Sequence, residues 1–381
     1  MIENIKIMGF KSIKLMELDL KPINILIGSN GSGKSNFLLF FKLLSAIFNT
    51  RLPSFVAEEN ADNLLYFGRK KTFEIHSEII FKDIELRNVG YYFRLSQNNE
   101  GGLILDWESS GYAINNKRRR DGAWNNFNFH QFDSIDGSKL KTEDENIIIP
   151  DTYQTNKNIK KNIESIKIFH FHDTTSTSFL RSECNLNDNL YFKPDGRNLP
   201  AMLYLIKFKH PKIYSRILKT IQSIAPYIES FILEPNKLKE ETIALRWIDK
   251  GDLESNFSAY QLSDGTLRFI ALATLLMQPE PPAVIIIDEP ELGLHPFAIG
   301  KLAGMIQTAS SESQIIIATQ SPSLISHFKP EDVIVVDKSE SENQSIFKRL
   351  DSESLDIWLE EYSLGDLWER NIINAAQPFE K

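Results

Sequence analysis

The feature that most constrains the fold is a glycine-rich segment near the N-terminus, Gly28–Ser35, with the sequence GSNGSGKS. It follows a short β-branched run, Ile23–Ile27, and precedes Phe37–Phe48, whose apolar residues recur at helical spacing. A strand, a glycine turn and a helix in this order aim backbone N–H groups and the positive helix end at one phosphate. The segment therefore predicts an α/β core with a phosphate-binding loop; a glycine turn without a ligand is the alternative.

Each residue of this P-loop has an expected role in binding a nucleotide. Lys34 is expected to reach the β- and γ-phosphates and to assist catalysis, and the Ser35 hydroxyl is expected to bind Mg²⁺. The neighbouring backbone completes the phosphate cradle. The expected nucleotide contacts are Gly28, Ser29, Asn30, Gly31, Ser32, Gly33, Lys34, Ser35 and Asn36.

A second motif places two carboxylates directly after a buried strand. Val284–Ile287 is continuously apolar and is followed by Asp288 and Glu289. Ligands of open α/β sheets bind at the carboxyl ends of the strands. Asp288 is therefore expected to hold Mg²⁺, directly or through water, and Glu289 to orient or deprotonate an attacking water. Two surface acids without a ligand are the alternative, which the P-loop disfavours.

A third motif, Leu262–Thr266 (LSDGT), runs into a predicted helix over 262–278. Ser263 or Asp264 is expected to cap this helix, and Gly265 eases the turn. Capping alone requires no ligand. The position of the motif, shortly before the second motif, is what connects it with the same site.

The remaining chain divides into segments of different texture. Residues 72–110 predict antiparallel strands, 111–160 predict loops with some pairing, and 199–228 predict helices. Apolar runs at 284–287, 315–318 and 333–336, with helices between them, predict parallel core strands. We expect four parts: 1–60, the N-terminal core with the P-loop; 61–194, a β-rich subdomain with a loop-rich insertion; 195–258, a helical subdomain; and 259–381, the C-terminal core.

These motifs together resemble a known family. The order GSNGSGKS, LSDGT and IDEPELGLHP is similar to the ABC-type ATPase heads of SMC and RecF proteins, whose opening strand resembles Gly9–Ser12 (GFKS). DGRNLPAMLYL, LSDGTLRFIALATLL and TQSP are similar, more narrowly, to stand-alone bacterial RecF-like predicted AAA family ATPases. The resemblance implies a P-loop NTPase of ABC/SMC-head type, with a mixed core sheet, an antiparallel β-subdomain and a helical insertion.

The resemblance also implies an activity. Such heads dock head to tail as a homodimer that sandwiches ATP and Mg²⁺. Ser263 and Gly265 of one protomer would then contact the γ-phosphate bound by the other, and Pro290–His295 would form the D-loop at the interface. The implied function is Mg²⁺-dependent ATP hydrolysis that closes and opens the dimer. By family analogy alone, it would serve DNA repair or anti-phage DNA sensing, with double-stranded DNA as a partner.

The sequence departs from the wider family pattern at three positions. Asp264 stands where the signature has glycine, and Thr266 stands where it has Gln or Glu. Gln320 stands where transporter ATPases have a switch histidine. Because glutamine contacts a γ-phosphate but takes no proton at neutral pH, we assign Gln320 to the catalytic set and expect slow turnover. The best Q-loop candidate is His172–Thr174.

Composition excludes several classes of protein. The net charge of −8 argues against a chain that is basic throughout and binds nucleic acid on that account. The single cysteine, Cys184, allows no intrachain disulfide and no cysteine metal cluster. With no apolar spanning run and no signal peptide, these features predict a cytoplasmic protein with no membrane association.

Two weaker features are interpreted structurally. Lys117–Arg120 is the densest basic run and could bind a phosphate backbone, although a solvated loop is favoured. His170 and His172 alternate and are expected to share one face of a strand. Metal binding is conceivable there, but no third ligand is evident in the sequence, so a structural role is favoured.

Two other functions compete with the DNA role. One is a regulatory ATP switch that recruits a separately encoded nuclease, since no nuclease motif is visible in the chain. The other is a transporter ATPase subunit that serves a membrane partner. The GFKS opening, the altered signature and the missing switch histidine disfavour the transporter.

Overall fold

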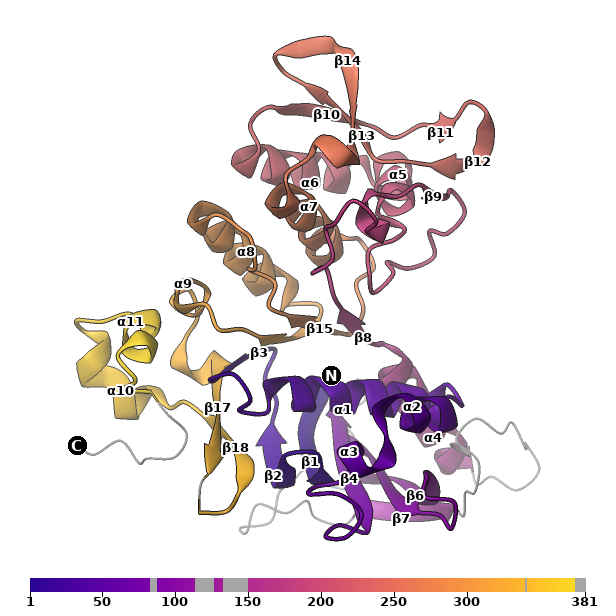
Figure 1. Cartoon of the computed structure of the whole chain (residues 1–381), viewed down its shortest axis with the longest axis vertical. Coiled ribbons are helices and arrows are strands. Elements are labelled where there is room, and N and C mark those ends of the chain that lie inside the picture. Colours follow the sequence, from indigo (N-terminus) through magenta and orange to yellow (C-terminus); the bar gives the residue numbers. More distant parts are fainter. Residues whose placement is uncertain (83–87, 114–126, 133–149, 340, 374–381) are drawn as a thin grey trace. The chain divides into compact units, whose positions relative to one another are not determined.

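The computed structural model describes residues 1–82, 88–113, 127–132, 150–339 and 341–373, and the chain forms two compact units (Figure 1). Unit 1 comprises Met1–Ile166, Pro330–Asp356 and Asn371–Lys381. Unit 2 comprises Lys167–Lys329 and Ile357–Arg370. Each unit therefore joins segments that are far apart in the sequence. The division into four parts remains a prediction about the sequence.

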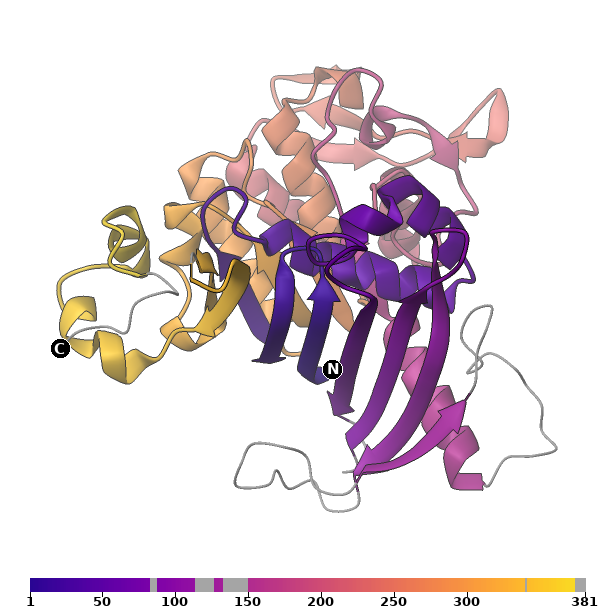
Figure 2. The same ribbon diagram turned by 60° about the horizontal axis from the view of Figure 1, so that its bottom comes forward.

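Unit 1 contains an antiparallel sheet in the order β2-β1-β4-β5-β6-β7 (Figure 2). The strands predicted over 72–110 are therefore confirmed. The strands are β1 (Ile2–Phe10), β2 (Ile13–Asp19), β4 (Glu74–Lys82), β5 (Asn88–Gln97), β6 (Leu103–Ala113) and β7 (Phe127–Phe132).

The helix after the P-loop, α1 (Lys34–Phe48), is anchored by aromatic packing. The ring of Phe40 stacks on that of Phe93 in β5, with ring centroids 6.1 Å apart. The ring of Phe48 meets that of Tyr91 edge to face at 5.1 Å. All four side chains are buried, so the helical spacing predicted from sequence is confirmed. These aromatic contacts hold the helix that follows the P-loop against strand β5.

The other strands of unit 1 are β3 (Ile23–Ile27), β17 (Val333–Ser339) and β18 (Gln344–Arg349). β17 pairs in parallel with β3 and antiparallel with β18, so the core strands are mixed. Short helical segments connect these strands to the antiparallel sheet and to unit 2. They are α2 (Leu52–Glu59), α3 (Ala61–Leu64), α4 (Pro150–Glu164) and η4 (Pro330–Asp332), while α10 (Ser352–Leu359) crosses the boundary between the units.

Helix α4 corrects the prediction of loops with some pairing over 111–160, although the pairing of β6 with β7 agrees with part of it. Its sequence, PDTYQTNKNIKKNIE, is mostly polar, which hid the helix. The two isoleucines four residues apart, Ile159 and Ile163, are buried and supply the packing that stabilises it. The basic run Lys117–Arg120 lies outside the described residues.

The core of unit 2 holds β15 (Val284–Asp288) in parallel with β16 (Gln314–Ala318), and β8 (Ile166–Phe169) lies beside β15. Helix α7 (Asp264–Met277) is mostly apolar and is buried on every side from Thr266 to Leu276, which is typical of a helix inside a core. It contacts α8 (Pro296–Ala309). The strands and helices predicted over 262–318 are therefore confirmed. The smaller elements here are η2 (Phe179–Arg181), α9 (Pro322–Ile325) and α11 (Leu364–Glu369).

The segment 195–258 begins with helices and continues as strands. The two helices, α5 (Leu199–Lys209) and α6 (Pro211–Ile224), confirm the helical prediction. The strands after them form the sheets β10-β13-β14 and β11-β12-β9. They were missed because β12 and β14 are mostly exposed and lack an apolar alternation. The elements are β9 (Cys184–Asn185), β10 (Ile228–Ile232), β11 (Pro235–Asn236), β12 (Lys239–Ile243), β13 (Arg246–Asp249), β14 (Asp252–Ser258) and η3 (Ala259–Gln261).

Within the described part of the chain, every helix is too short or too polar to cross a bilayer.

Candidate functional site

The P-loop of unit 1 connects the buried strand β3 with α1, as the sequence predicted. Two of its glycines are required by close contacts. A Cβ at Gly28 would overlap the carbonyl oxygen of Val336 in β17, and one at Gly33 would overlap the hydroxyl of Ser345. Gly33 also has a φ of 118°, a conformation open to glycine. The loop therefore packs too closely on its own unit for larger residues.

Lys34 and the serines around it fit a phosphate ligand. The Lys34 ammonium is buried and donates to the carbonyl oxygens of Gly28 at 2.5 Å and Ser29 at 3.0 Å. Among the described residues, the buried hydroxyl of Ser32 has no hydrogen-bond partner. Ser35 is exposed in the first turn of α1. A cation, an unpaired hydroxyl and a helix N-terminus in one short loop are what phosphate oxygens require. The remaining predicted contacts, Ser29, Asn30 and Gly31, are exposed on the same loop.

 Asn36 lies beside this loop and lines a cavity of about 680 Å³. Its lining includes Lys11, Ser12, Asn36, Tyr66 and Lys338, but none of Gly28–Ser35. The Asn36 amide donates to the Ser12 hydroxyl at 2.7 Å. A space of this size is typical of small-molecule pockets and adjoins the P-loop helix.

The predicted catalytic pair of unit 2 lies at the end of β15. The backbone N–H of Glu289 donates to the Ala318 carbonyl at 2.8 Å, and the Gln320 amide donates to Glu289 Oε1 at 2.9 Å. Glu289 has a φ of 40°, which is rare outside glycine. Such strain costs about 1–2 kcal/mol and is often found at functional sites. The structure thus brings Glu289 and Gln320 together, next to Asp288.

The LSDGT segment forms the N-terminus of α7, and Ser263 is its cap. The Ser263 hydroxyl accepts from the Thr266 N–H at 3.2 Å. Asp264 is paired with the buried guanidinium of Arg181 at 2.6 Å. A Cβ at Gly265 would lie 2.5 Å from the Gly293 carbonyl oxygen, so Gly265 allows this segment to touch the predicted D-loop.

A cavity of about 270 Å³ opens between the signature segment and Pro290–His295. Ser263, Gly265 and Thr266 line one part of it, and Gly293 and His295 line another. His295 caps α8 by accepting from the Phe297 N–H at 3.3 Å. The N-terminus of α7 therefore faces this cavity within unit 2.

Sequence reasoning missed three charged residues that organise unit 2. Arg181 donates to the Thr174 carbonyl at 2.8 Å in addition to its pair with Asp264. Arg268, in α7, donates to the carbonyls of Phe171 at 2.8 Å and His172 at 3.0 Å, and burial lowers the pKa of its guanidinium. An arginine inside the apolar run TLRFIALATLL was the available signal, because a buried charge requires partners.

Glu291 is the third missed residue. Burial raises the pKa of its carboxyl above the ordinary value. Oε1 accepts a hydrogen bond from the Thr319 hydroxyl, and Oε2 is buried without a hydrogen-bond partner among the described residues. Glu291 lies inside the predicted D-loop, which the family resemblance assigned as a segment without a role for this residue.

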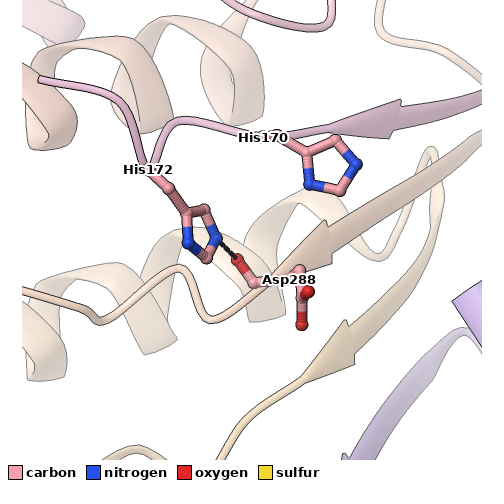
Figure 3. A group of neighbouring side chains, drawn as sticks. All are labelled: His170, His172 and Asp288. Atoms are coloured by element: carbon pink, nitrogen blue, oxygen red, sulfur yellow. Dashed lines mark hydrogen bonds between the residues drawn. The ribbon is translucent and has the colours of Figure 1, made fainter. Parts of the chain in front are cut away.

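The two histidines lie after strand β8, which ends at Phe169, rather than on it. The alternation nevertheless continues, because Phe171 is buried and packs against Phe192 with ring centroids 5.8 Å apart. His170 and His172 share a face, as predicted, and Asp288 lies beside them (Figure 3). The structure thus supplies a third candidate ligand that the sequence did not reveal. Assignment of His172–Thr174 as the Q-loop remains a prediction.

Comparisons with known proteins agree with this architecture. A family profile described as "AAA domain, putative AbiEii toxin, Type IV TA system" matches residues 23–326. The crystal structure of an SmcHead bound to the C-winged helix domain of ScpA is similar, with a TM-score of 0.56, 17% identity, and coverage of 93% of this chain and 99% of that chain. No curated protein matches the sequence.

A second solved structure is similar to the same degree. It is an Smc head domain with an extended coiled coil bound to the C-terminal domain of ScpA, from Pyrococcus furiosus, with a TM-score of 0.55 and 14% identity. The match covers 94% of this chain and 98% of that chain. Identities this low show the fold alone. The chain belongs to the AAA-domain family with the AbiEii-type description, and it has the fold of an SMC/RecF-like ABC-type ATPase head.

Proposed function

We propose that this protein binds ATP with Mg²⁺ and hydrolyses it slowly, and that ATP binding closes a homodimer. The observation that carries the proposal is the P-loop itself. It joins a buried ammonium, an unpaired buried hydroxyl and a helix N-terminus on a loop whose glycines are required by close packing. Family membership supports the same function, since AAA domains and SMC heads are typically ATPases.

Each side chain has a role in this proposal. Lys34 binds the β- and γ-phosphates, and Ser35 with Asp288 holds Mg²⁺. The metal supplies charge neutralisation on the phosphates. Glu289 accepts a proton from the attacking water, and Gln320, which already donates to Glu289, orients that carboxylate. Because the Gln320 amide takes no proton at neutral pH, we expect turnover to be slow.

The dimer role rests on the signature segment. Ser263 caps a helix of 14 residues, and the N-terminus of that helix opens on the cavity shared with the D-loop. A helix N-terminus attracts an anion. We propose that the γ-phosphate bound by the other protomer enters here, close to Ser263 and Gly265.

ATP binding is tested by replacing Lys34 with alanine. Lys34→Ala should abolish ATP binding, measured by calorimetry, while the circular dichroism spectrum stays unchanged. Lys42→Ala is the matched control, because Lys42 is exposed on the same helix. Wild-type ATP affinity in a folded Lys34→Ala variant would contradict the proposal.

The shared site is tested by mixing two inactive variants. Ser263→Arg should bind ATP but fail to hydrolyse it, because a bulky cation fills the cavity. Mixing it with Lys34→Ala restores one composite site, with the P-loop of the first variant and the signature of the second. We expect ATPase activity to rise with the mixing ratio. Background activity at every ratio, with mixed dimers shown to form, would argue for self-contained sites.

The consumer of the ATP cycle is a separate proposal. By analogy with the fold, it is DNA repair or sensing of foreign double-stranded DNA in the cytoplasm. The family description, which names a toxin of a type IV system, favours an alternative in which the ATP state controls a separately encoded effector such as a nuclease. Purification from native cells followed by mass spectrometry separates these: a co-purifying soluble nuclease supports the switch, and DNA without a protein partner supports the first function.

A further inference from the structure

We propose that His170, His172 and Asp288 form a binding site for a divalent transition-metal ion such as Mn²⁺, Co²⁺ or Zn²⁺. The proposal deepens the function above, because Asp288 is the residue proposed to hold Mg²⁺. It concerns a metal site within unit 2 and requires no nucleotide.

The geometry brings three ligand atoms together from two segments of the chain. One atom from each side chain lies within 4.8 Å of the other two (Figure 3). With metal–ligand bonds near 2.1 Å, ligand atoms around one ion are about 3 Å apart. His172 is exposed and the other two are half-buried, so side-chain rotation has to close this difference.

The backbone that carries the histidines is already fixed. The His170 N–H donates to the Pro194 carbonyl at 2.9 Å. Arg268 holds the carbonyls of Phe171 and His172, and the Phe171 ring is buried in the aromatic core. A site of this kind loses little backbone entropy when the ion binds, because its ligands are carried on held backbone.

The ring of His172 is already directed at Asp288. Its Nε2 lies 2.8 Å from the backbone oxygen of Asp288. A carbonyl oxygen only accepts, so Nε2 carries the hydrogen there. The ion takes the place of this hydrogen bond or uses Nδ1 after rotation of the ring.

The donor set selects the class of ion. Mg²⁺ favours oxygen ligands and keeps much of its water, whereas imidazole suits Mn²⁺, Co²⁺ and Zn²⁺. Two imidazoles and one carboxylate leave open coordination positions for water or a phosphate oxygen. A transition-metal ion bound here would therefore occupy the position that Asp288 offers to Mg²⁺ in the ATPase reaction.

Direct titration of the full chain without nucleotide tests the site. Co²⁺ is added to the metal-free protein, and the visible d–d absorption and the heat of binding are recorded. His172→Gln is the first variant, because the exposed ring is removed with little risk to folding, and His170→Gln is the second. His327→Gln is the matched control, since His327 is an exposed histidine of the same unit.

We expect one Co²⁺ per chain in the wild type and in His327→Gln. Each of the other two variants should lose at least about 100-fold in affinity, the upper end of what the loss of an outer partner costs at a metal site. Mg²⁺ in tenfold excess should leave the cobalt absorption in place. Equal Co²⁺ affinity in wild type and both variants, or displacement of Co²⁺ by equimolar Mg²⁺, would overturn the proposal.

Lys34→Ala separates this proposal from the ATPase. That variant should bind Co²⁺ like the wild type while it loses ATP. If it retains ATP, the proposed function fails and the cobalt result still stands. If it loses ATP and the wild type shows no cobalt absorption, the metal site fails and the ATPase proposal stands.

Discussion

The P-loop of unit 1 and the strand end of unit 2 both carry candidate site residues, and the two regions are built in different ways. The P-loop is one unbroken segment, Gly28–Ser35, shaped by its own glycines and by backbone contacts. The strand end gathers residues from separate segments of the chain, and buried arginines hold two of these segments in place. A site built from one contiguous segment can be predicted directly from the sequence. A site assembled from side chains of separate segments can be predicted only in part.

The largest expected effect separates ATP binding, which we assign to the P-loop, from ATP hydrolysis, which we assign to the strand end. Glu289→Gln removes the proposed base and keeps the shape and the hydrogen bond with Gln320. General-base catalysis contributes about 10²–10⁴-fold, so hydrolysis should fall by that factor while ATP affinity stays close to wild type. ATP should then accumulate a dimer in light scattering. Normal turnover in this variant would place the base elsewhere.

The next effect tests whether backbone packing shapes the P-loop. Gly28→Ala forces a methyl group into the Val336 carbonyl and should destabilise the protein by about 3 kcal/mol, the upper range for overpacking. Gly31→Ala is the control, because its Cβ would meet open space and only the positive φ costs about 1–2 kcal/mol. Urea unfolding measures both. Equal losses would show that close packing is unimportant.

A smaller effect tests whether a side chain organises unit 2. Arg268→Leu leaves the Phe171 carbonyl buried without its donor, at a cost of about 1–3 kcal/mol. Arg216→Leu is the control, because the Arg216 side chain is exposed on α6, and it should change stability little. Thermal unfolding compares the two variants. If both leave the midpoint unchanged, Arg268 does not hold the histidine loop.

The smallest expected effect concerns Glu291. Burial raises the pKa of its carboxyl, so the folded protein keeps a proton that the unfolded chain has lost. Stability from this group is complete below the unfolded pKa and falls as pH rises through the folded pKa. Glu291→Gln should therefore be slightly more stable than wild type at pH 7, and the gain should shrink toward pH 4.5. Glu312→Gln, which is exposed, is the control in the same urea titrations.

The sequence predicted the elements whose signals are local. The P-loop, α1 and the strand before Asp288 were all found because apolar spacing and glycine placement operate over a few residues. Helix α4 and strands β12 and β14 were missed because their sequences are polar. The third candidate ligand beside His170 and His172 was missed for a different reason. Asp288 lies more than a hundred residues along the chain, and its place depends on the pairing of strands.

The contact between Gly265 and the Gly293 carbonyl has a mechanical consequence. There is no room for a side chain between these two backbones, so an alanine at position 265 would force the signature segment and the D-loop apart. We expect Gly265→Ala to have this effect in a single protomer, without dimer formation.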